Sequence, residues 1–381
     1  TPNDGVDNDG NGYVDDYNGW NVGNNTDNIG TGGHGTAVAG MIGAKGDNGL
    51  GVAGANWDVK MMVVAGYSNP FTQANVVEAY TYPMEHRILY NQTNGADGAF
   101  VVSTNASWGI DNGDPSDYPI WCDFYDDLGE VGILNCGATT NSNSNVDQTG
   151  DIPTACASDY MVSVTATDAN DIIDFAGYGQ NTINVAAPGS NIFSTASNGG
   201  YSNTSGTSFA SPLTAGVIAL MYSIPCPSFM SFVKSDPQGA ADAVRDALYN
   251  GVDQNSHLMT RTTTGGRINA KTSIDLLMAQ LCSSCQPPSN ITVDNVGDND
   301  ITISFDGVTD ADDYTIYIQE EGTGNWSSTT TTSLTHVFNG LNSCRTFEIY
   351  IESNCCSDVS SSSPITTVST TGCGNCIELT Y

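Results

Sequence analysis

Residues 205–212 read Ser205-Gly206-Thr207-Ser208-Phe209-Ala210-Ser211-Pro212 and lead into an apolar run that ends at Met221. Val217, Leu220 and Met221 recur at helical spacing, so the run predicts a buried helix with Ser208 at its start. The first backbone N–H groups of a helix lack intrahelical partners, and with the positive helix end they can stabilise an oxyanion. Ser208 is therefore either a nucleophile beside such donors or an N-cap, since serine is a preferred cap.

A second stretch surrounds a histidine with small residues. It reads Thr31-Gly32-Gly33-His34-Gly35-Thr36-Ala37-Val38-Ala39-Gly40, and Val38 and Ile42 give it an apolar stripe at helical spacing. Small neighbours let a substrate approach His34 closely, and neutral imidazole at a helix start can act as a general base. The remaining histidines lack such surroundings and are interpreted as surface or packing residues; they are His86, His257 and His336.

The N-terminal segment carries oxygen-bearing side chains at every second residue. They belong to Asp7, Asp9, Asn11 and Asp15, and the backbone carbonyl of Tyr13 occupies the seventh position of the loop. Oxygen ligands at this spacing suit a hard cation, so the pattern predicts a structural calcium site. The glutamate that closes an EF-hand loop is missing, so this is not an EF-hand. The alternative is an acidic, solvated turn.

Apolar runs of strand length alternate with helical patterns through the first three quarters of the chain. Strands are predicted at 59–64, 99–103, 131–134, 160–166 and 182–186, and helices at 72–91, at 241–249 and in a segment that ends at Leu277. Continuous apolar strands alternating with helices indicate a parallel sheet that is covered on both faces. In such sheets the site lies at the carboxyl ends of the strands.

Two of these motifs resemble those of a known enzyme family. Gly33–Gly40 and Gly206–Pro212 are similar to the histidine and serine signatures of subtilisin-like serine peptidases, in the family's order. The resemblance covers roughly residues 1–280 and implies an α/β fold, a subtilisin-like three-layer α/β/α arrangement with a mostly parallel sheet. It also implies that Ser208 is the nucleophile of a serine endopeptidase and that His34 is its general base.

The resemblance extends to the segments that would hold the substrate. Ser107-Trp108-Gly109 resembles the strand that pairs with the substrate backbone. Trp108 either lines a side-chain pocket or packs outward.

The oxyanion-hole asparagine of the family corresponds to Asn141. Thr140 stands where the family usually has glycine, so Thr139 and Asn143 remain alternatives.

The family's aspartate has no counterpart in this sequence. It belongs to an Asp-Ser/Thr-Gly turn after an apolar strand, and no such turn precedes His34. We expect that aspartate, with its strand, upstream of Thr1 in a longer precursor. The chain alone is then expected to be poorly active, because losing a triad carboxylate costs on the order of 10⁴ in kcat.

The alternative is a non-catalytic binding or adhesion protein on a degenerate fold of this family. An esterase is disfavoured, because no Gly-x-Ser-x-Gly surrounds Ser208.

The composition changes after Cys282. Short alternating strands with acidic turns follow, typical of a β-sandwich. This segment resembles a fibronectin type III domain in which Phe305 replaces the core tryptophan and Phe347 the corner tyrosine. The predicted domains are the peptidase at 1–282, the small all-β sandwich at 283–371 and the start of a further segment or tail at 372–381. The sandwich is a candidate for docking to a surface or a substrate.

Charge and cysteine content limit the partners and the compartment. The 42 acidic residues outnumber 9 basic ones, giving a net charge of −33. Such a surface repels nucleic acids and anionic membranes, so we expect protein or peptide substrates instead.

Eleven cysteines predict disulfides in an oxidising compartment and, being odd in number, one thiol left over. The sequence contains no run of 18 apolar residues and therefore predicts no membrane span. A secreted or cell-surface protein is expected.

Overall fold

The computed structural model describes residues 4–8, 10–66, 72–282, 285–309, 311–355 and 358–373. The chain divides into two compact units. The first contains residues up to 224 together with 231–280, and the second contains 225–230 and the residues from 281 onward.

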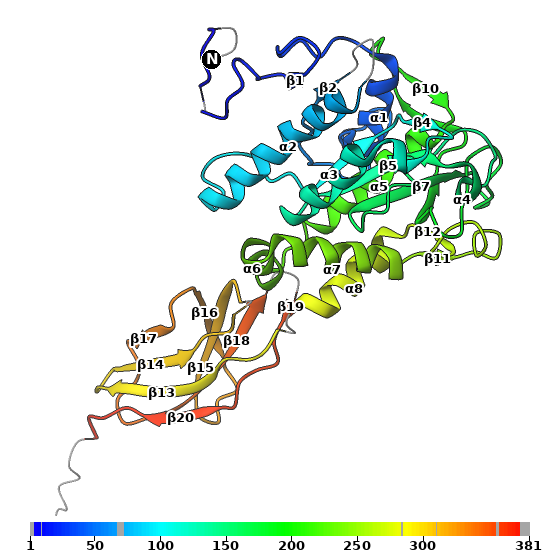
Figure 1. The fold of residues 1–381 in the computed structure, drawn as a ribbon. Helices are drawn as coiled ribbons and strands as arrows, with labels where there is room; N and C mark the ends of the chain where they lie inside the picture. Colours follow the sequence, from blue (N-terminus) through cyan, green and yellow to red (C-terminus); the bar gives the residue numbers. More distant parts are fainter. Residues whose placement is uncertain are drawn as a thin grey trace, which may run out of the picture. The chain divides into compact units, whose positions relative to one another are not determined.

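The first unit is built on a six-stranded sheet with the strand order β11-β12-β8-β7-β5-β3 (Figure 1). The strands are β3 (Ser103–Ala106), β5 (Leu134–Ala138), β7 (Met161–Thr167), β8 (Val185–Pro188), β11 (Asp253–Gln254) and β12 (Gly266–Arg267). The strands from β3 to β12 run parallel, and only β11 is antiparallel to its neighbour. Every residue of β5 and β7 is buried, as expected for strands covered on both faces. The predicted parallel α/β fold is confirmed.

Helices cover this sheet. They are α1 (Gly33–Gly43), α2 (Gln73–Thr93), α3 (Pro119–Glu130), α4 (Val146–Thr149), α5 (Thr207–Met221), α7 (Pro237–Asn250) and α8 (Ala270–Leu281), with the 3-10 turn η1 (Pro115–Asp117). Helix α5 packs against β3, β5, β7 and β8, and α1 packs against α5. Helices α2 and α3 pack together, and α3 also contacts β5 and α7. Helix α5 is buried along most of its length, as its apolar sequence predicts.

Three small sheets complete the first unit. They pair β1 (Trp20–Asn21) with β2 (Val64–Ala65), β4 (Ile110–Asp111) with β6 (Asp151–Ile152), and β9 (Ile192–Thr195) with β10 (Tyr201–Thr204). The β1–β2 pair is parallel and the other two pairs are antiparallel. The pair β1–β2 is thus separate from the six-stranded sheet, although both belong to the same unit.

The strand boundaries differ from the sequence prediction. The runs predicted at 99–103 and 131–134 form strands only from Ser103 and Leu134 onward, and the run at 59–64 forms a strand only at Val64–Ala65. Apolar character marks burial, whereas a strand requires a hydrogen-bonded neighbour. Among the residues that the structure describes, the strand pairing near this run begins only at Val64, which pairs with Trp20 of β1.

The second unit consists of two antiparallel sheets. One has the order β13-β14-β17 and the other β16-β15-β18-β19, with β20 also paired to β18. The strands are β13 (Ser289–Val296), β14 (Asp300–Asp306), β15 (Asp313–Glu320), β16 (Ser327–Thr331), β17 (Thr335–Asn339), β18 (Thr346–Cys355), β19 (Asp358–Val359) and β20 (Thr366–Ser369). Helix α6 (Pro227–Ser235) begins in this unit. Phe305 and Phe347 are both buried in the core that side chains of both sheets form.

Four disulfides confirm the predicted use of the cysteines. They join Cys122–Cys156, Cys226–Cys282, Cys285–Cys355 and Cys344–Cys373. Among the cysteines that the structure describes, Cys136 alone is free, and it is buried in β5. None of the described helices has the length and apolar character that crossing a membrane requires.

Candidate active site

Ser208 is the second residue of α5. The N-cap position belongs to Gly206, and no described side chain caps the helix, so the interpretation of Ser208 as the N-cap is wrong. The Ser208 hydroxyl donates a hydrogen bond to the backbone carbonyl of Ser107 at 3.2 Å. In return, the Ser107 hydroxyl donates to the carbonyl of Ser208 at 2.8 Å. The nucleophile candidate therefore lies directly beside the segment 107–109.

His34 is the second residue of α1 and its side chain is exposed. Its ring centroid lies 5.9 Å from that of Phe209, the residue after Ser208. The starts of α1 and α5 are thus neighbours, as the two sequence motifs predict. No hydrogen bond joins His34 to Ser208, and within the described residues no carboxylate bonds to His34.

The strand β9 holds the helix that carries His34. The hydroxyl of Ser194 donates to the carbonyl of Ala37, and that of Thr195 donates to the carbonyl of Thr36, both at 2.7 Å. A Cβ at Gly40 would lie within 2.5 Å of both hydroxyl oxygens. Glycine at this position therefore permits the close approach of α1 to β9.

Asn141 lies in the loop that follows β5, and its side chain contacts the first residue of α5. Its side-chain oxygen accepts hydrogen bonds from the backbone N–H of Thr207 at 2.9 Å and from the Thr207 hydroxyl at 3.2 Å. The Asn141 side chain thus contacts Thr207, the residue before Ser208, and its role at an oxyanion stays a prediction. Of the two alternatives, Thr139 is buried and accepts the Thr207 hydroxyl only through its backbone carbonyl, and Asn143 has no contact with α5 among the described hydrogen bonds.

The segment Ser107-Trp108-Gly109 is held between the nucleophile and β6. A Cβ at Gly109 would lie 2.0 Å from the carbonyl oxygen of Ile152, so only glycine fits there. The Trp108 ring packs on Trp121 at a centroid distance of 5.4 Å, while 42% of the Trp108 side chain stays exposed. Trp108 thus packs on one side and faces solvent on the other, and its lining of a side-chain pocket stays a prediction.

Asp151 is a buried acid near the site, and it was not identified from the sequence. It is only 1% exposed, and its carboxylate accepts hydrogen bonds from the Thr140 N–H at 3.2 Å and the Thr154 hydroxyl at 2.5 Å. Burial raises the pKa of Asp151 to about 6, and the charge of Asp111 on the paired strand adds to the effect. The Asp151 carboxylate anchors the loop that presents Asn141. An aspartate after a glycine carries no local signal of burial, so the sequence could not identify it.

The predicted calcium ligands lie in the N-terminal loop, with Asp9 outside the described residues. The Asp7 carboxylate accepts hydrogen bonds from the backbone N–H groups of residues 10, 11 and 12. The Asp15 carboxylate accepts from those of residues 4 and 5. In the ranges that the structure describes, no three or more acidic, histidine or cysteine side chains are grouped closely enough to hold a metal ion.

The other two predicted ligands contact neighbouring helices and loops. The Asn11 amide donates to the carboxylate of Asp16 at 2.9 Å. The Tyr13 hydroxyl donates to Glu85 at 2.5 Å, and burial together with Glu85 raises the Tyr13 pKa. The Tyr13 ring stacks on His86, which is buried and therefore a packing residue, one of the two roles expected for it.

Known proteins are similar to this chain in sequence. A sequence model described as "Subtilase family" matches residues 3–272. Subtilisin-like protease 1 of Plasmodium berghei is 29% identical over 58% of this chain and 38% of its own length. The cell wall-associated protease of Bacillus subtilis is 30% identical over 53% of this chain and 20% of its own length. The chain thus spans well under half the length of these two relatives.

One solved structure, a cold-adapted subtilisin-like serine proteinase, shares 24% identity with this chain. The match covers 66% of this chain and 78% of that protein, with a TM-score of 0.47.

Proposed function

This chain belongs to the subtilase family, and we propose that it forms the catalytic part of a serine endopeptidase with Ser208 as nucleophile and His34 as general base. The observation that carries the proposal is the meeting of the two helix starts. The His34 ring lies 5.9 Å from that of Phe209, which is adjacent to Ser208. This proximity supports the pairing of a general base with a serine nucleophile, which acyl transfer uses.

The remaining groups act on the substrate. A peptide that pairs with residues 107–109 would pass close to Ser208, because the Ser208 hydroxyl lies within hydrogen-bond distance of the Ser107 carbonyl. His34 takes the hydroxyl proton as the acyl-enzyme forms and returns it to the leaving amine. The Asn141 amide and the backbone N–H groups at the start of α5 stabilise the oxyanion. Trp108 borders the same segment, and its exposed side is available to a substrate side chain.

The carboxylate that orients His34 comes from outside residues 1–381 in this proposal. Among the described residues no acid bonds to His34, and removing the triad acid lowers kcat by on the order of 10⁴. The chain by itself is therefore expected to be a poor catalyst.

A serine-directed fluorophosphonate tests the assignment, using the longest natural form of the protein. We expect the probe to label Ser208, and the S208A variant to lose both labelling and protein hydrolysis. Ser202 is exposed on β10, so S202A is a matched control that should behave as wild type. Equal hydrolysis by S208A and wild type would contradict the proposal and favour a non-catalytic binding protein.

We also propose that the N-terminal loop binds calcium as a structural ion. Support comes from the spacing of the oxygen donors and from their hardness, which suits Ca²⁺. Asp7, Asp9, Asn11, Asp15 and the carbonyl of Tyr13 would hold the ion. The ion would neutralise the carboxylates of Asp7 and Asp15, which accept hydrogen bonds from backbone N–H groups of the loop.

A secreted or cell-surface location is proposed on two grounds. The four disulfides suit an oxidising compartment. One relative is described as cell wall-associated.

The second unit is proposed to be a fibronectin type III-like domain that docks the enzyme to a surface or a substrate. Its partition into a three-stranded sheet and a sheet built around β15 and β18 supports the resemblance.

A further inference from the structure

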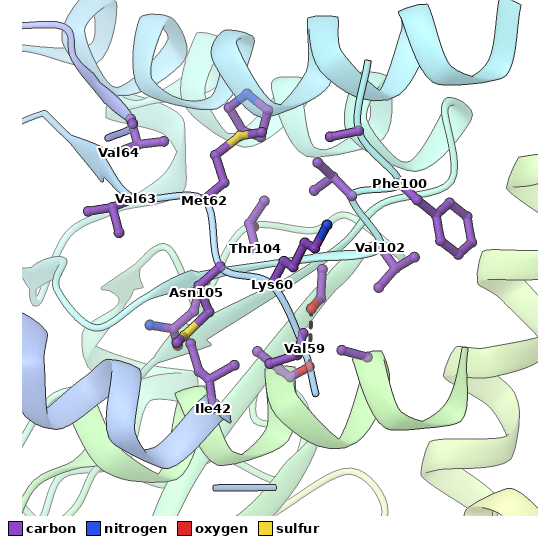
Figure 2. Close-up of a pocket in the computed structure, with 18 of the residues that line it drawn as sticks. Ile42, Val59, Lys60, Met62, Val63, Val64, Phe100, Val102, Thr104 and Asn105 are labelled. Atoms are coloured by element: carbon purple, nitrogen blue, oxygen red, sulfur yellow. Dashed lines mark hydrogen bonds between the residues drawn. The ribbon is translucent and has the colours of Figure 1, made fainter. Parts of the chain in front are cut away.

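Three aromatic side chains lie on the outer face of a sheet in the second unit. In the first unit, by contrast, side chains such as Met62 and Phe100 line a cavity of about 1470 Å³ (Figure 2). In the second unit, Tyr317 of β15 and Tyr350 of β18 stack with their ring centroids 4.5 Å apart. The Trp326 ring, just before β16, packs edge-on against Tyr350 at a centroid distance of 4.7 Å.

The register of β15 and β18 shows that these rings point away from the core. Tyr317 pairs with Tyr350 across the two strands. Their neighbours in sequence, Ile316, Ile349 and Ile351, are fully buried in the core of the second unit. Because successive side chains of a strand point to opposite faces, both tyrosines lie on the outer face, and both remain partly exposed. We call this surface the aromatic face; it consists of Tyr317, Gln319, Trp326, Glu348, Tyr350 and Glu352.

Two carboxylates flank the rings on β18. Glu348 and Glu352 are each two residues from Tyr350, so they share its face of the strand and lie about 13 Å apart at ~3.3 Å per residue. The Gln319 amide donates a hydrogen bond to Glu348, and the Tyr317 hydroxyl donates one to Glu352. Both donors are neutral. Among the ion pairs of the described residues, none includes either carboxylate.

The Glu352 carboxylate acts on both stacked rings. Burial raises the pKa of Tyr317 and of Tyr350, and the charge of Glu352 adds to the effect in each. A cation beside Glu352 therefore lies beside the tyrosine rings as well. Aromatic faces attract cations, arginine more often than lysine, and a planar guanidinium also pairs with a carboxylate through two N–H groups. The rings and carboxylates together thus match arginine.

The arginines of this chain already have partners elsewhere. Arg345, the one arginine of the second unit, lies 3.5 Å from Glu320. The others contact groups of the first unit; they are Arg87, Arg245, Arg261 and Arg267. An arginine on the aromatic face therefore belongs to another molecule. Since the chain has a net charge of −33, its surface attracts basic partners.

We propose that the aromatic face binds a basic segment of another protein, in an extended conformation and with two arginines four residues apart. One guanidinium lies against the Tyr317 ring and pairs with Glu352, and the other pairs with Glu348. The spacing matches because four residues of an extended peptide also span about 13 Å. This inference names a partner for the docking proposed above. The docking role rests on that proposed function, whereas the binding of a basic segment rests only on the aromatic face.

Peptide binding to the longest natural form of the protein, with its disulfides intact, tests the proposal. The probe is the acetylated, amidated peptide Gly-Arg-Ser-Thr-Ser-Arg-Gly with a fluorophore. The matched control peptide carries citrulline at both arginine positions, which keeps the shape of arginine without its charge. We expect the arginine peptide to bind about ten-fold more tightly than the citrulline peptide in about 150 mM salt.

Two charge-matched variants separate this face from the overall charge of the protein. E348Q/E352Q removes both carboxylates with little change of shape, and should weaken binding of the arginine peptide about ten-fold. D294N/D306N removes the same charge from exposed positions of the other sheet and should bind the peptide as wild type does. Y317L removes one ring and keeps both carboxylates, and should weaken binding about three-fold; its thermal midpoint shows whether the fold is retained.

The outcomes separate a basic segment from other ligands and from the catalysis. Equal binding of the arginine and citrulline peptides, or equal losses in the two double variants, would overturn the proposal. Binding of the neutral sugar oligomer chitohexaose, with no binding of the arginine peptide, would assign the face to a glycan and also overturn it.

Two further results distinguish this inference from the proposed function. Failure of the peptide to bind while Ser208 still reacts with the fluorophosphonate would overturn the inference and leave the proposed peptidase intact. Loss of peptide binding in E348Q/E352Q, without a rise in KM for an arginine-rich substrate protein, would support the basic-segment site and count against its use in docking substrates.

Discussion

Replacing Asp151 by asparagine should change how the stability of this protein depends on pH. Asp151 is 1% exposed and its two hydrogen-bond donors, the Thr140 N–H and the Thr154 hydroxyl, are neutral. The ionised form therefore loses hydration on folding without gaining a cationic partner among the described ion pairs. Burial is the main reason that its pKa rises from 3.8 to about 6.

The sign and size follow from this pKa. The folded state holds the Asp151 proton more tightly than the unfolded state, so the group contributes stability below about pH 4 and that contribution is lost as the pH rises through about 6. A pKa rise of about 2 corresponds to about 3 kcal/mol. The asparagine side chain would be neutral in both states, so the D151N variant should gain about 3 kcal/mol relative to wild type between about pH 3.5 and about pH 7.5.

Urea unfolding of both proteins across this pH range measures the difference. Loss of hydrogen-bond quality in D151N shifts its curve by the same amount at every pH, and therefore leaves the pH-dependent part intact. D97N is a matched control, because Asp97 is exposed and should give a curve parallel to wild type. Parallel curves for D151N and wild type would show that Asp151 is not a buried, protonatable acid and would refute the reasoning.

Three further predictions concern the site, the loop and the disulfides. N141A should lower kcat about 10²–10³-fold in protein that hydrolyses peptides, with a smaller change in KM, because an oxyanion donor acts in the transition state; an unchanged kcat would exclude Asn141 from that role. Removing calcium with a chelator should lower the thermal midpoint and added Ca²⁺ should restore it, whereas an unchanged midpoint would count against the loop 7–15 as a calcium site. The C122A/C156A double variant should lose about 2–4 kcal/mol of unfolding free energy, since the disulfide Cys122–Cys156 closes a loop with a sequence separation of 34; equal urea midpoints for variant and wild type would contradict this.

Helices were the elements best predicted from sequence. The helix expected at 72–91 occupies Gln73–Thr93, and Thr72 caps it by accepting a hydrogen bond from the N–H of Asn75. Periodicity and capping act within a few residues, so the local sequence contains the information that sets the helix. Strand ends were predicted less well. The run at 99–103 is apolar throughout most of its length, but its pairing with β5 begins only at Ser103.

The amino-acid sequence by itself determined the kind of fold and the order of the two motifs. It also identified Ser208 as the candidate nucleophile and His34 as the candidate general base. These follow from residue type and spacing along the chain. Only the tertiary structure decided that Asn141 meets Thr207 at the start of α5, that Asp151 is buried beneath the same loop, and that β1 and β2 form a sheet separate from the six-stranded one. Burial and hydrogen-bond partners depend on segments far apart in sequence. The serine motif thus identified a nucleophile candidate, whereas the groups around that serine became visible only in the folded chain.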